Sequence, residues 1–197
     1  VSSVLVIWSD PGYGLSCSVR AGDAAALQAL FYHLRPADVR TRFFRQLRSL
    51  TNEMAQHLSG VGYEQEMAFA AVVGEPESER IVGTSSYFLD PRTGLADVAY
   101  MVDPEWQGVG LGTLLQLRTI EYARAHGIRG LTADVLMSNA AMLAVFRRSG
   151  CQLTSHVADG VIELQLLFEE PVDVTRRAVT RRLPSRDRRS SATRRPT

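Results

Sequence analysis

Residues 107–117, QGVGLGTLLQL, place three glycines within five positions directly before a run of leucines. Glycine inside a helix is less stable than alanine by about 1 kcal/mol, so a glycine cluster at a helix start indicates another purpose for the backbone. A glycine turn there leaves N–H groups unpaired at the positive end of the helix dipole, and phosphate is a common occupant of such sites. The stretch therefore predicts an anion-binding loop that opens a helix.

Two widespread phosphate-binding motifs do not fit this loop. A Walker A loop needs a lysine before its Ser or Thr, and Gly112-Thr113 has none. A Rossmann fingerprint has the spacing G-x-G-x-x-G, whereas this chain has G-x-G-x-G. Asp134 stands where the ribose-binding acid would be, but too little ordered chain follows it to complete a doubly wound domain.

The composition predicts one core in a soluble, cytoplasmic protein. The chain has 197 residues, 45% of them hydrophobic, which is enough for one sizeable core. Cys17 and Cys151 form no C-x-x-C pair, which indicates a reducing compartment. No apolar run approaches the roughly 20 residues of a membrane span, and VLVIW (4–8) lacks the basic flank of a signal peptide. We expect no association with a membrane.

The charges are divided unevenly along the chain. Residues 171–197 contain nine arginines and two aspartates, a net charge of +7, so residues 1–170 carry −6. That segment has almost no large apolar side chains, which predicts a disordered tail. It could bind nucleic acid, but it has no interleaved aromatic residues and no motif, so a solvated tail is favoured. We expect an N-terminal segment (1–14), one domain (15–170) and the tail (171–197).

The hydrophobic periodicity predicts a mixed α/β (α+β) domain. Helices are expected at 23–34, 36–47, 113–127 and 139–150, and strands at 15–23, 66–73, 80–90, 96–102, 130–137, 151–157 and 161–168. Short turns at 74–78 and 90–94 favour antiparallel neighbours, as does the hairpin turn at Asp159-Gly160. The strand–helix–strand unit that contains the glycines should be a parallel, right-handed crossover.

VDPEWQGVGLG (102–112) supplies the pattern Q-x-x-G-x-G and resembles the acetyl-CoA loop of the GNAT acetyltransferase superfamily. The resemblance implies the GNAT fold, a mixed and mostly antiparallel sheet with helices on both faces. It also implies that acetyl-CoA is the co-substrate and that backbone N–H groups hold its pyrophosphate. The implied coenzyme-binding residues are Gln107, Gly108, Val109, Gly110, Gly112, Thr113 and Asn139, with an oxyanion donor at Met101 or Val102.

LRPADVRTRFF, YEQEMAFAAVVG, ADVAYMV and NAAMLAVFRRSG narrow this resemblance to the GNAT domain of bacterial Pat-type protein lysine acetyltransferases. That family carries a catalytic Glu in an A-E-h-A pattern, and ADVA places Asp97 there. Glu66, at the start of EMAFAAVV, is the reserve candidate for the base. Many GNAT enzymes have a Tyr seven residues after the Asn, and this chain has Phe146 instead.

These patterns predict an acetyl-CoA-dependent N-acetyltransferase that acts on exposed lysines of a protein partner, with acyl-CoA synthetases as a target class implied by the resemblance. An acetyltransferase for small amines or protein N-termini, and a non-catalytic acetyl-CoA sensor, remain open alternatives. No metal is expected, because the four histidines show no ligand spacing. The sequence leaves the oligomeric state open.

Overall fold

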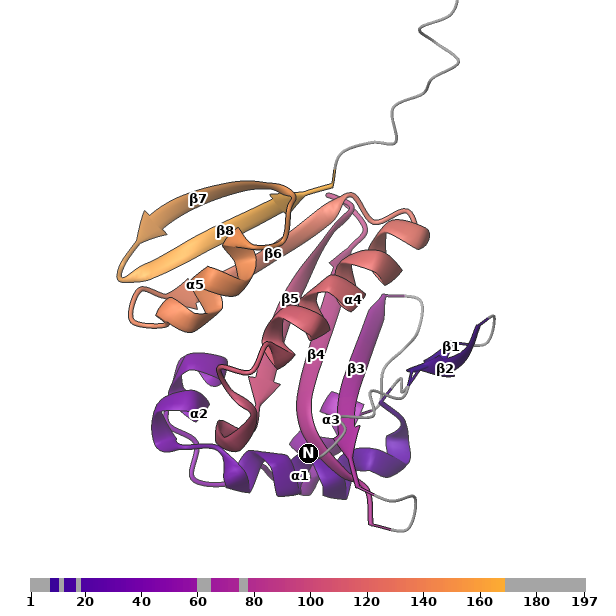
Figure 1. Ribbon diagram of the computed structural model, residues 1–197. Coiled ribbons are helices and arrows are strands. Elements are labelled where there is room, and N and C mark those ends of the chain that lie inside the picture. The colour runs from indigo at the N-terminus through magenta and orange to yellow at the C-terminus, as the bar shows by residue number, and fades with distance from the viewer. Residues whose placement is uncertain (1–7, 11–12, 17–18, 60–64, 75–77, 169–197) are drawn as a thin grey trace, which may run out of the picture.

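The computed structural model describes residues 8–10, 13–16, 19–59, 65–74 and 78–168, and its centre is a six-stranded sheet (Figure 1). The strand order is β3-β4-β5-β6-β8-β7. These strands are β3 (Glu66–Val73), β4 (Arg80–Asp90), β5 (Leu95–Val102), β6 (Gly130–Leu136), β7 (Gln152–Ala158) and β8 (Val161–Leu167). β1 (Trp8–Asp10) and β2 (Tyr13–Ser16) form a separate antiparallel pair. The expected tail at 171–197 lies outside the described residues.

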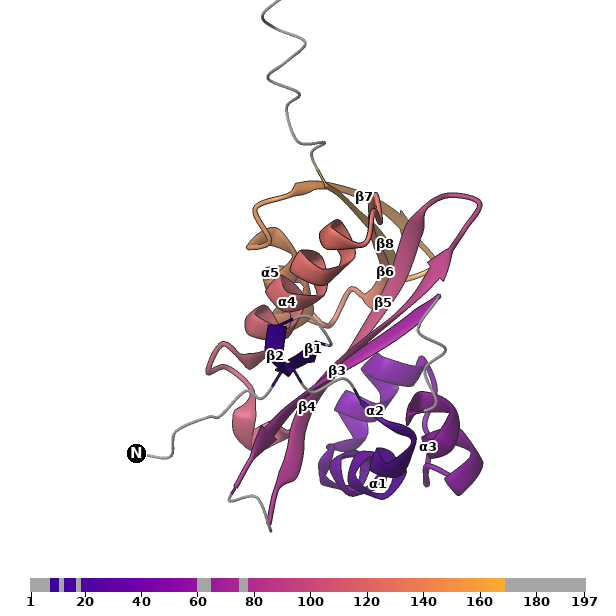
Figure 2. The ribbon, with the colours of Figure 1, turned by 90° about the vertical axis from the view of Figure 1, so that its right-hand side faces the viewer.

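Helices cover the two faces of the sheet (Figure 2). One face carries α1 (Ala24–His33), α2 (Pro36–Phe43) and α3 (Asn52–Ser59), and the other carries α4 (Leu111–Ala125) and α5 (Ala140–Arg147). Two single 3-10 turns, η1 (Ala21–Asp23) and η2 (Pro104–Trp106), precede α1 and the glycine loop. The predicted arrangement of helices on both faces is confirmed.

Because side chains alternate along the strands, each face of the sheet has a large core, and a smaller third cluster consists of Ala71, Val82, Leu111 and Leu115. Leu131, Leu166 and Phe146 lie in the core under α4 and α5, and each is at most 1% exposed. Leu27 and Leu30 of α1 lie in the core on the opposite face. On β5, Ala96 and Val98 belong to the first core and Met101 to the second. Asp97 therefore points to the face that carries α1, α2 and α3.

The sheet is antiparallel except between β5 and β6, which α4 connects as the predicted parallel crossover. β5 and β6 pair only over Leu95–Asp97 and Gly130–Thr132. Beyond these residues β5 continues to pair with β4 as far as Val102, and β6 with β8 as far as Leu136. The two strands therefore diverge, and the main chain on the facing edges loses its strand partner.

Three sequence expectations for the N-terminal third differ from the structure. The helix expected at 36–47 ends at Phe43, because Phe44 adopts a left-handed conformation with φ of 55°. The strand expected at 15–23 is a strand only to Ser16 within the described residues. Val19 instead donates a single hydrogen bond to the Ala68 carbonyl, at 3.0 Å. Helix α3 had no predicted counterpart.

Candidate active site

The glycine loop connects η2 to α4 and contains two left-handed residues. Gly108 has φ of 76° and Gly110 has φ of 94°, a region that L side chains rarely adopt. A Cβ at either position would meet nothing within 4 Å, so the backbone conformation, not space, requires glycine there. At Gly112 neither reason applies, since its φ is not positive and a Cβ on it would make an ordinary contact, 3.5 Å from Cγ2 of Val145 on α5.

The first turn of α4 offers free N–H groups to an anion. Among the described residues, none of the N–H groups from Gly108 to Thr113 has a backbone or side-chain acceptor. They lie at the positive end of a 15-residue helix, and Val109 is 68% exposed. An open, positive and unpaired set of donors is what a pyrophosphate requires, so the residues present fit coenzyme A.

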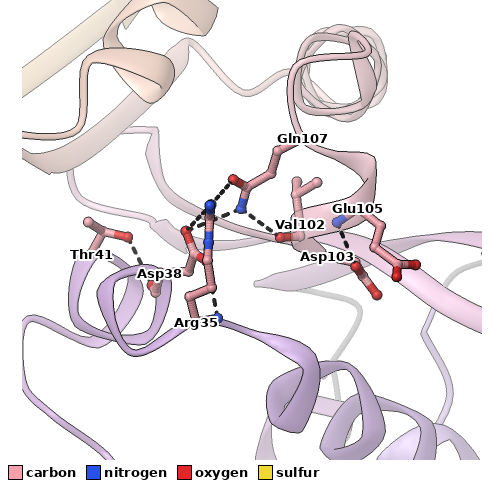
Figure 3. A network of polar contacts seen from close by, with 7 residues as sticks. All are labelled: Arg35, Asp38, Thr41, Val102, Asp103, Glu105 and Gln107. Atoms are coloured by element: carbon pink, nitrogen blue, oxygen red, sulfur yellow. Dashed lines mark hydrogen bonds and ion pairs between the residues drawn. The ribbon is translucent and has the colours of Figure 1, made fainter.

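The side-chain amide of Gln107 forms hydrogen bonds with three other residues (Figure 3). Its Nε2 donates to Oδ1 of Asp38 at 3.2 Å and to the Val102 carbonyl at 3.1 Å. Its Oε1 accepts from Nη2 of Arg35. Gln107 therefore joins three segments, the end of β5, the glycine loop and the start of α2. Its side chain positions the loop, and a direct contact with the coenzyme stays a prediction.

Asp38 is the centre of this junction. Its Oδ2 accepts from the backbone N–H of Arg35 at 3.1 Å, which caps α2, and from the guanidinium Nε at 2.8 Å. Partial burial alone would raise the pKa of Asp38, but the hydrogen bonds from Arg35 and Gln107 outweigh it and the pKa is lowered. The carboxylate is thus held in its ionised form between helix and loop.

Asp103 anchors the other side of the loop. It is 1% exposed, and its Oδ1 accepts from the N–H of Glu105 at 2.9 Å. Its Oδ2 accepts from Nη1 of Arg80 at 3.0 Å and lies 3.3 Å from Nδ1 of His33. Neither this cluster nor the bonds of Arg35 and Asp38 to Gln107 were predicted from the sequence, because Arg80 is 23 residues from Asp103 and Gln107 is 72 from Arg35 and 69 from Asp38.

Asn139 caps α5, where its Oδ1 accepts from the N–H of Met142 at 3.1 Å. Its role as a coenzyme contact stays a prediction. Met101 and Val102 lie on the part of β5 that has diverged from β6. The side chain of Met101 is buried on the α1–α3 face, and the carbonyl of Val102 is occupied by Gln107. The expected oxyanion donor lies on this strand segment.

Asp97 lies at the last paired position before the strands diverge, opposite Thr132 of β6. The residue reaches solvent, yet its surroundings remove enough water to raise the pKa of its carboxyl group. Asp134 raises the pKa further through its negative charge, and Arg42 of α2 opposes both. Nε of Arg42 is buried and has no hydrogen-bond partner among the described residues.

Glu66 shares the face of Asp97 but not its position. Phe88 pairs with both residues across the sheet, so the three lie in one row over β3, β4 and β5. Two strand spacings separate Glu66 from Asp97, about 10 Å. Asp97 is adjacent to the divergence of β5 and β6, and Glu66 is not.

The family model for the acetyltransferase (GNAT) family matches residues 31–151. The chain belongs to the GNAT acetyltransferase family. A relative, acetyltransferase PA5475 of Pseudomonas aeruginosa, is 29% identical over 124 residues, which are 63% of this chain and 67% of the relative. The protein is thus an N-acetyltransferase whose reaction depends on acetyl-CoA.

Solved structures confirm the GNAT fold. The GNAT domain of S. lividans PAT superposes with a TM-score of 0.70 at 22% identity, over 85% of this chain and 97% of that domain. A ribosomal L7/L12 alpha-N-protein acetyltransferase in complex with coenzyme A superposes with a TM-score of 0.62 at 16% identity. The match covers 78% of this chain and 93% of that protein. Spermidine N-acetyltransferase from Vibrio cholerae, in complex with CoA and spermine, superposes with a TM-score of 0.62 at 14% identity. The match covers 77% of this chain and 93% of that enzyme.

Phe146 and Cys151 each contact neighbouring side chains within the fold. Phe146 is 1% exposed and packs edge-to-face on Tyr100, with ring centroids 6.3 Å apart. Sγ of Cys151 lies 3.4 Å from Nη2 of Arg124.

Within the described ranges, no group of three or more His, Cys, Asp or Glu side chains is arranged to hold a metal ion. No described helix has the length and apolar character needed to cross a membrane.

Proposed function

We propose that this GNAT enzyme transfers the acetyl group of acetyl-CoA to the side-chain amine of lysine in a protein substrate. The observation that carries the proposal is the place of Asp97, at the point where β5 and β6 diverge, on the strand whose end leads into the glycine loop. The motifs that resemble Pat-type lysine acetyltransferases and the fold shared with the GNAT domain of S. lividans PAT support it. By the same resemblance, acyl-CoA synthetases are the proposed class of target.

The chain supplies two binding elements for the acetyl donor. The N–H groups of Gly108 to Thr113 hold the pyrophosphate at the start of α4, with Asn139 as a further contact. The diverged segment of β5 at Met101 and Val102 provides an N–H group for the thioester oxygen, where negative charge develops during attack. Gln107 and Asp103 hold the loop and the strand at a fixed separation.

Asp97 then acts as the base. Lysine has a pKa of about 10.4, so presenting the neutral amine at pH 7 costs about 4–5 kcal/mol. Asp97 accepts the proton, directly or through a water molecule, as the amine attacks. Its raised pKa favours this role, because the pKa moves toward the working pH. Phe146 has no proton to give, and a thiolate with a pKa of about 8.5 leaves without one.

The test is mass spectrometry of purified proteins and host lysate incubated with the enzyme and isotope-labelled acetyl-CoA. Acetylated lysines are the expected product. Asp97→Asn should lower turnover at least 100-fold with little change in acetyl-CoA affinity, since Asn retains the shape but accepts no proton. Asp97→Glu should match or exceed the natural rate if the family geometry applies.

Glu66→Gln is the matched control, because it removes the same charge from the same row of the sheet. Full activity in Asp97→Asn together with loss in Glu66→Gln would move the base to Glu66. Acetylation confined to small amines or protein N-termini would reject a lysine acceptor. Binding of acetyl-CoA without turnover on any acceptor would mean that the protein is a non-catalytic acetyl-CoA sensor.

A further inference from the structure

The outer half of the sheet forms a polar hollow of about 510 Å³ beside Asp97. Two cross-strand rows line it, Thr132–Gln165–Thr154 and Asp134–Glu163–His156, with one residue each from β6, β8 and β7. Thr132 is the direct neighbour of Asp97 on β5, so the hollow begins one strand from the proposed base. The core formed by α1, α2 and α3 includes residues of β3, β4 and β5. In Figure 2 these helices lie away from β7 and β8.

Three carboxylates lie in and beside this hollow, and Arg42 of α2 acts on one of them, Asp97, through its positive charge. Asp97, Asp134 and Glu163 form no ion pair with any residue that the structure describes. Asp134 and Glu163 are exposed and stand opposite each other on neighbouring strands. Carboxylates that share a surface in this way repel one another, and a cationic ligand relieves the repulsion.

We infer that this hollow binds a basic segment of the protein substrate and selects lysines that have a second basic residue nearby. The inference rests on the proposed function and names the acceptor class of the same site. A lysine whose amine reaches Asp97 on its four-carbon stem places the adjoining peptide over β6 and β8. Asp134 and Glu163 then pair with an arginine or lysine of that peptide.

The strand spacing fixes where the second basic residue belongs. Glu163 is two strands across from Asp97 and two residues along its strand, about 12 Å at the usual spacings. Residues two positions apart in an extended peptide point to the same side and are about 7 Å apart. A long arginine side chain covers the remaining distance. The hollow therefore favours a basic residue two positions before or after the acceptor lysine.

The test compares kcat/KM for two lysine peptides that differ only in Arg or Gln two positions from the lysine, on either side. Exposed ion pairs have modest strength, so the unmodified enzyme should prefer the Arg peptide about fivefold at low salt and less at high salt. Glu163→Gln should reduce the preference toward unity, and Glu163→Arg should invert it in favour of the Gln peptide. A loss of folded enzyme lowers both rates equally and leaves the ratio unchanged.

Glu53→Gln is the control, because it removes one exposed carboxylate from α3, outside the hollow. Its ratio should equal that of the unmodified enzyme. Equal rates for both peptides with the unmodified enzyme, or a preference that survives Glu163→Arg, would overturn the inference. An enzyme that acetylates neither peptide but does acetylate a small amine would instead remove the proposed function itself.

Discussion

Asp97 carries an electrostatic cost in the folded protein. Its carboxyl group has a raised pKa because its surroundings withdraw water from it and because Asp134 is negative. The folded chain thus binds this proton more tightly than the unfolded chain does. The stability that protonation provides is complete below the unfolded pKa of about 3.9, and it is lost as the pH rises through the folded pKa. At pH 7 the ionised group opposes folding.

Asp97→Asn should therefore raise the melting temperature at pH 7 while it removes turnover. The gain should shrink as the pH is lowered through the raised pKa of Asp97, because the natural side chain then becomes protonated and neutral too. Thermal melts at pH 7 and at a pH below this pKa measure the difference. Asp90→Asn should instead lower the melting temperature at pH 7, because hydrogen bonds from Arg92 lower the pKa of Asp90. A lower melting temperature for Asp97→Asn at pH 7 would show that Asp97 stabilises the fold.

Gly110 allows a separate test of the coenzyme loop. Gly110→Ala places an L residue at φ of 94°, which should distort the loop and raise KM for acetyl-CoA at least tenfold. Gly127→Ala is the matched control, since Gly127 has φ of 73°, an equally open surrounding, and lies past the far end of α4. Both variants should lose about 1 kcal/mol of stability. An equal KM in both would separate the loop from acetyl-CoA binding.

At the scale of elements, α2 and the glycine loop are coupled through Asp38 and Arg35, which both bond to the side chain of Gln107. Asp38→Ala removes the acceptor for Gln107 and the cap of α2 together. Asp23→Ala removes an equivalent cap at η1, where Asp23 accepts from the N–H of Arg20 at 2.7 Å and has no contact with the loop. Both variants should lose about 1 kcal/mol of stability.

Only Asp38→Ala should also raise KM for acetyl-CoA, by about three- to tenfold, because the loop loses its support from α2. Steady-state kinetics with varied acetyl-CoA measure the effect, and Asp38→Asn, which keeps an acceptor oxygen, should recover part of it. Two variants with the same KM would mean that Arg35, Val102 and Asp103 hold the loop without Asp38.

The sequence predicted most of the elements because their local signals were strong. The short apolar run in EMAFAAVV, the positive φ of Asp159 and Gly160 in the last hairpin, and the glycines before α4 are all local signals. The end of α2 at Phe44 has none, since a left-handed phenylalanine is unfavourable on its own. The site was predictable only as a loop and one acid. The neighbours of Asp97, Arg42 and Asp134, come from other elements and become visible only in the fold.

At the scale of the whole molecule, the sheet consists of two antiparallel halves with a narrow joint. β3, β4 and β5 form one half, and β6, β8 and β7 form the other. Three residue pairs join them, from Leu95–Gly130 to Asp97–Thr132. The same divergence that we propose admits acetyl-CoA thus leaves few hydrogen bonds to hold the halves together. Their registration depends on the joint and on α4, which packs across it.

Gly130 is the residue on which this joint depends, because it pairs with Leu95 on one side and Leu167 on the other. A methyl group there would overlap the main-chain carbonyl of Leu166, and backbone cannot move aside as a side chain can. Gly130→Ala should cost about 3 kcal/mol, which lowers the melting temperature of a domain of this size by about 6–12 °C. Because the joint adjoins Asp97, turnover should fall even at temperatures where the variant is folded.

Gly22→Ala is the control, since a Cβ added at Gly22 would meet nothing within 4 Å. Alanine in a compatible conformation should leave the stability of the protein equal or higher by up to about 1 kcal/mol. Thermal melts and kinetics of both variants decide the matter. A Gly130→Ala protein with an unchanged melting temperature would mean that the two halves can shift at the joint without loss. The position of Asp97 would then be set by β4 and α2 and not by its pairing with β6.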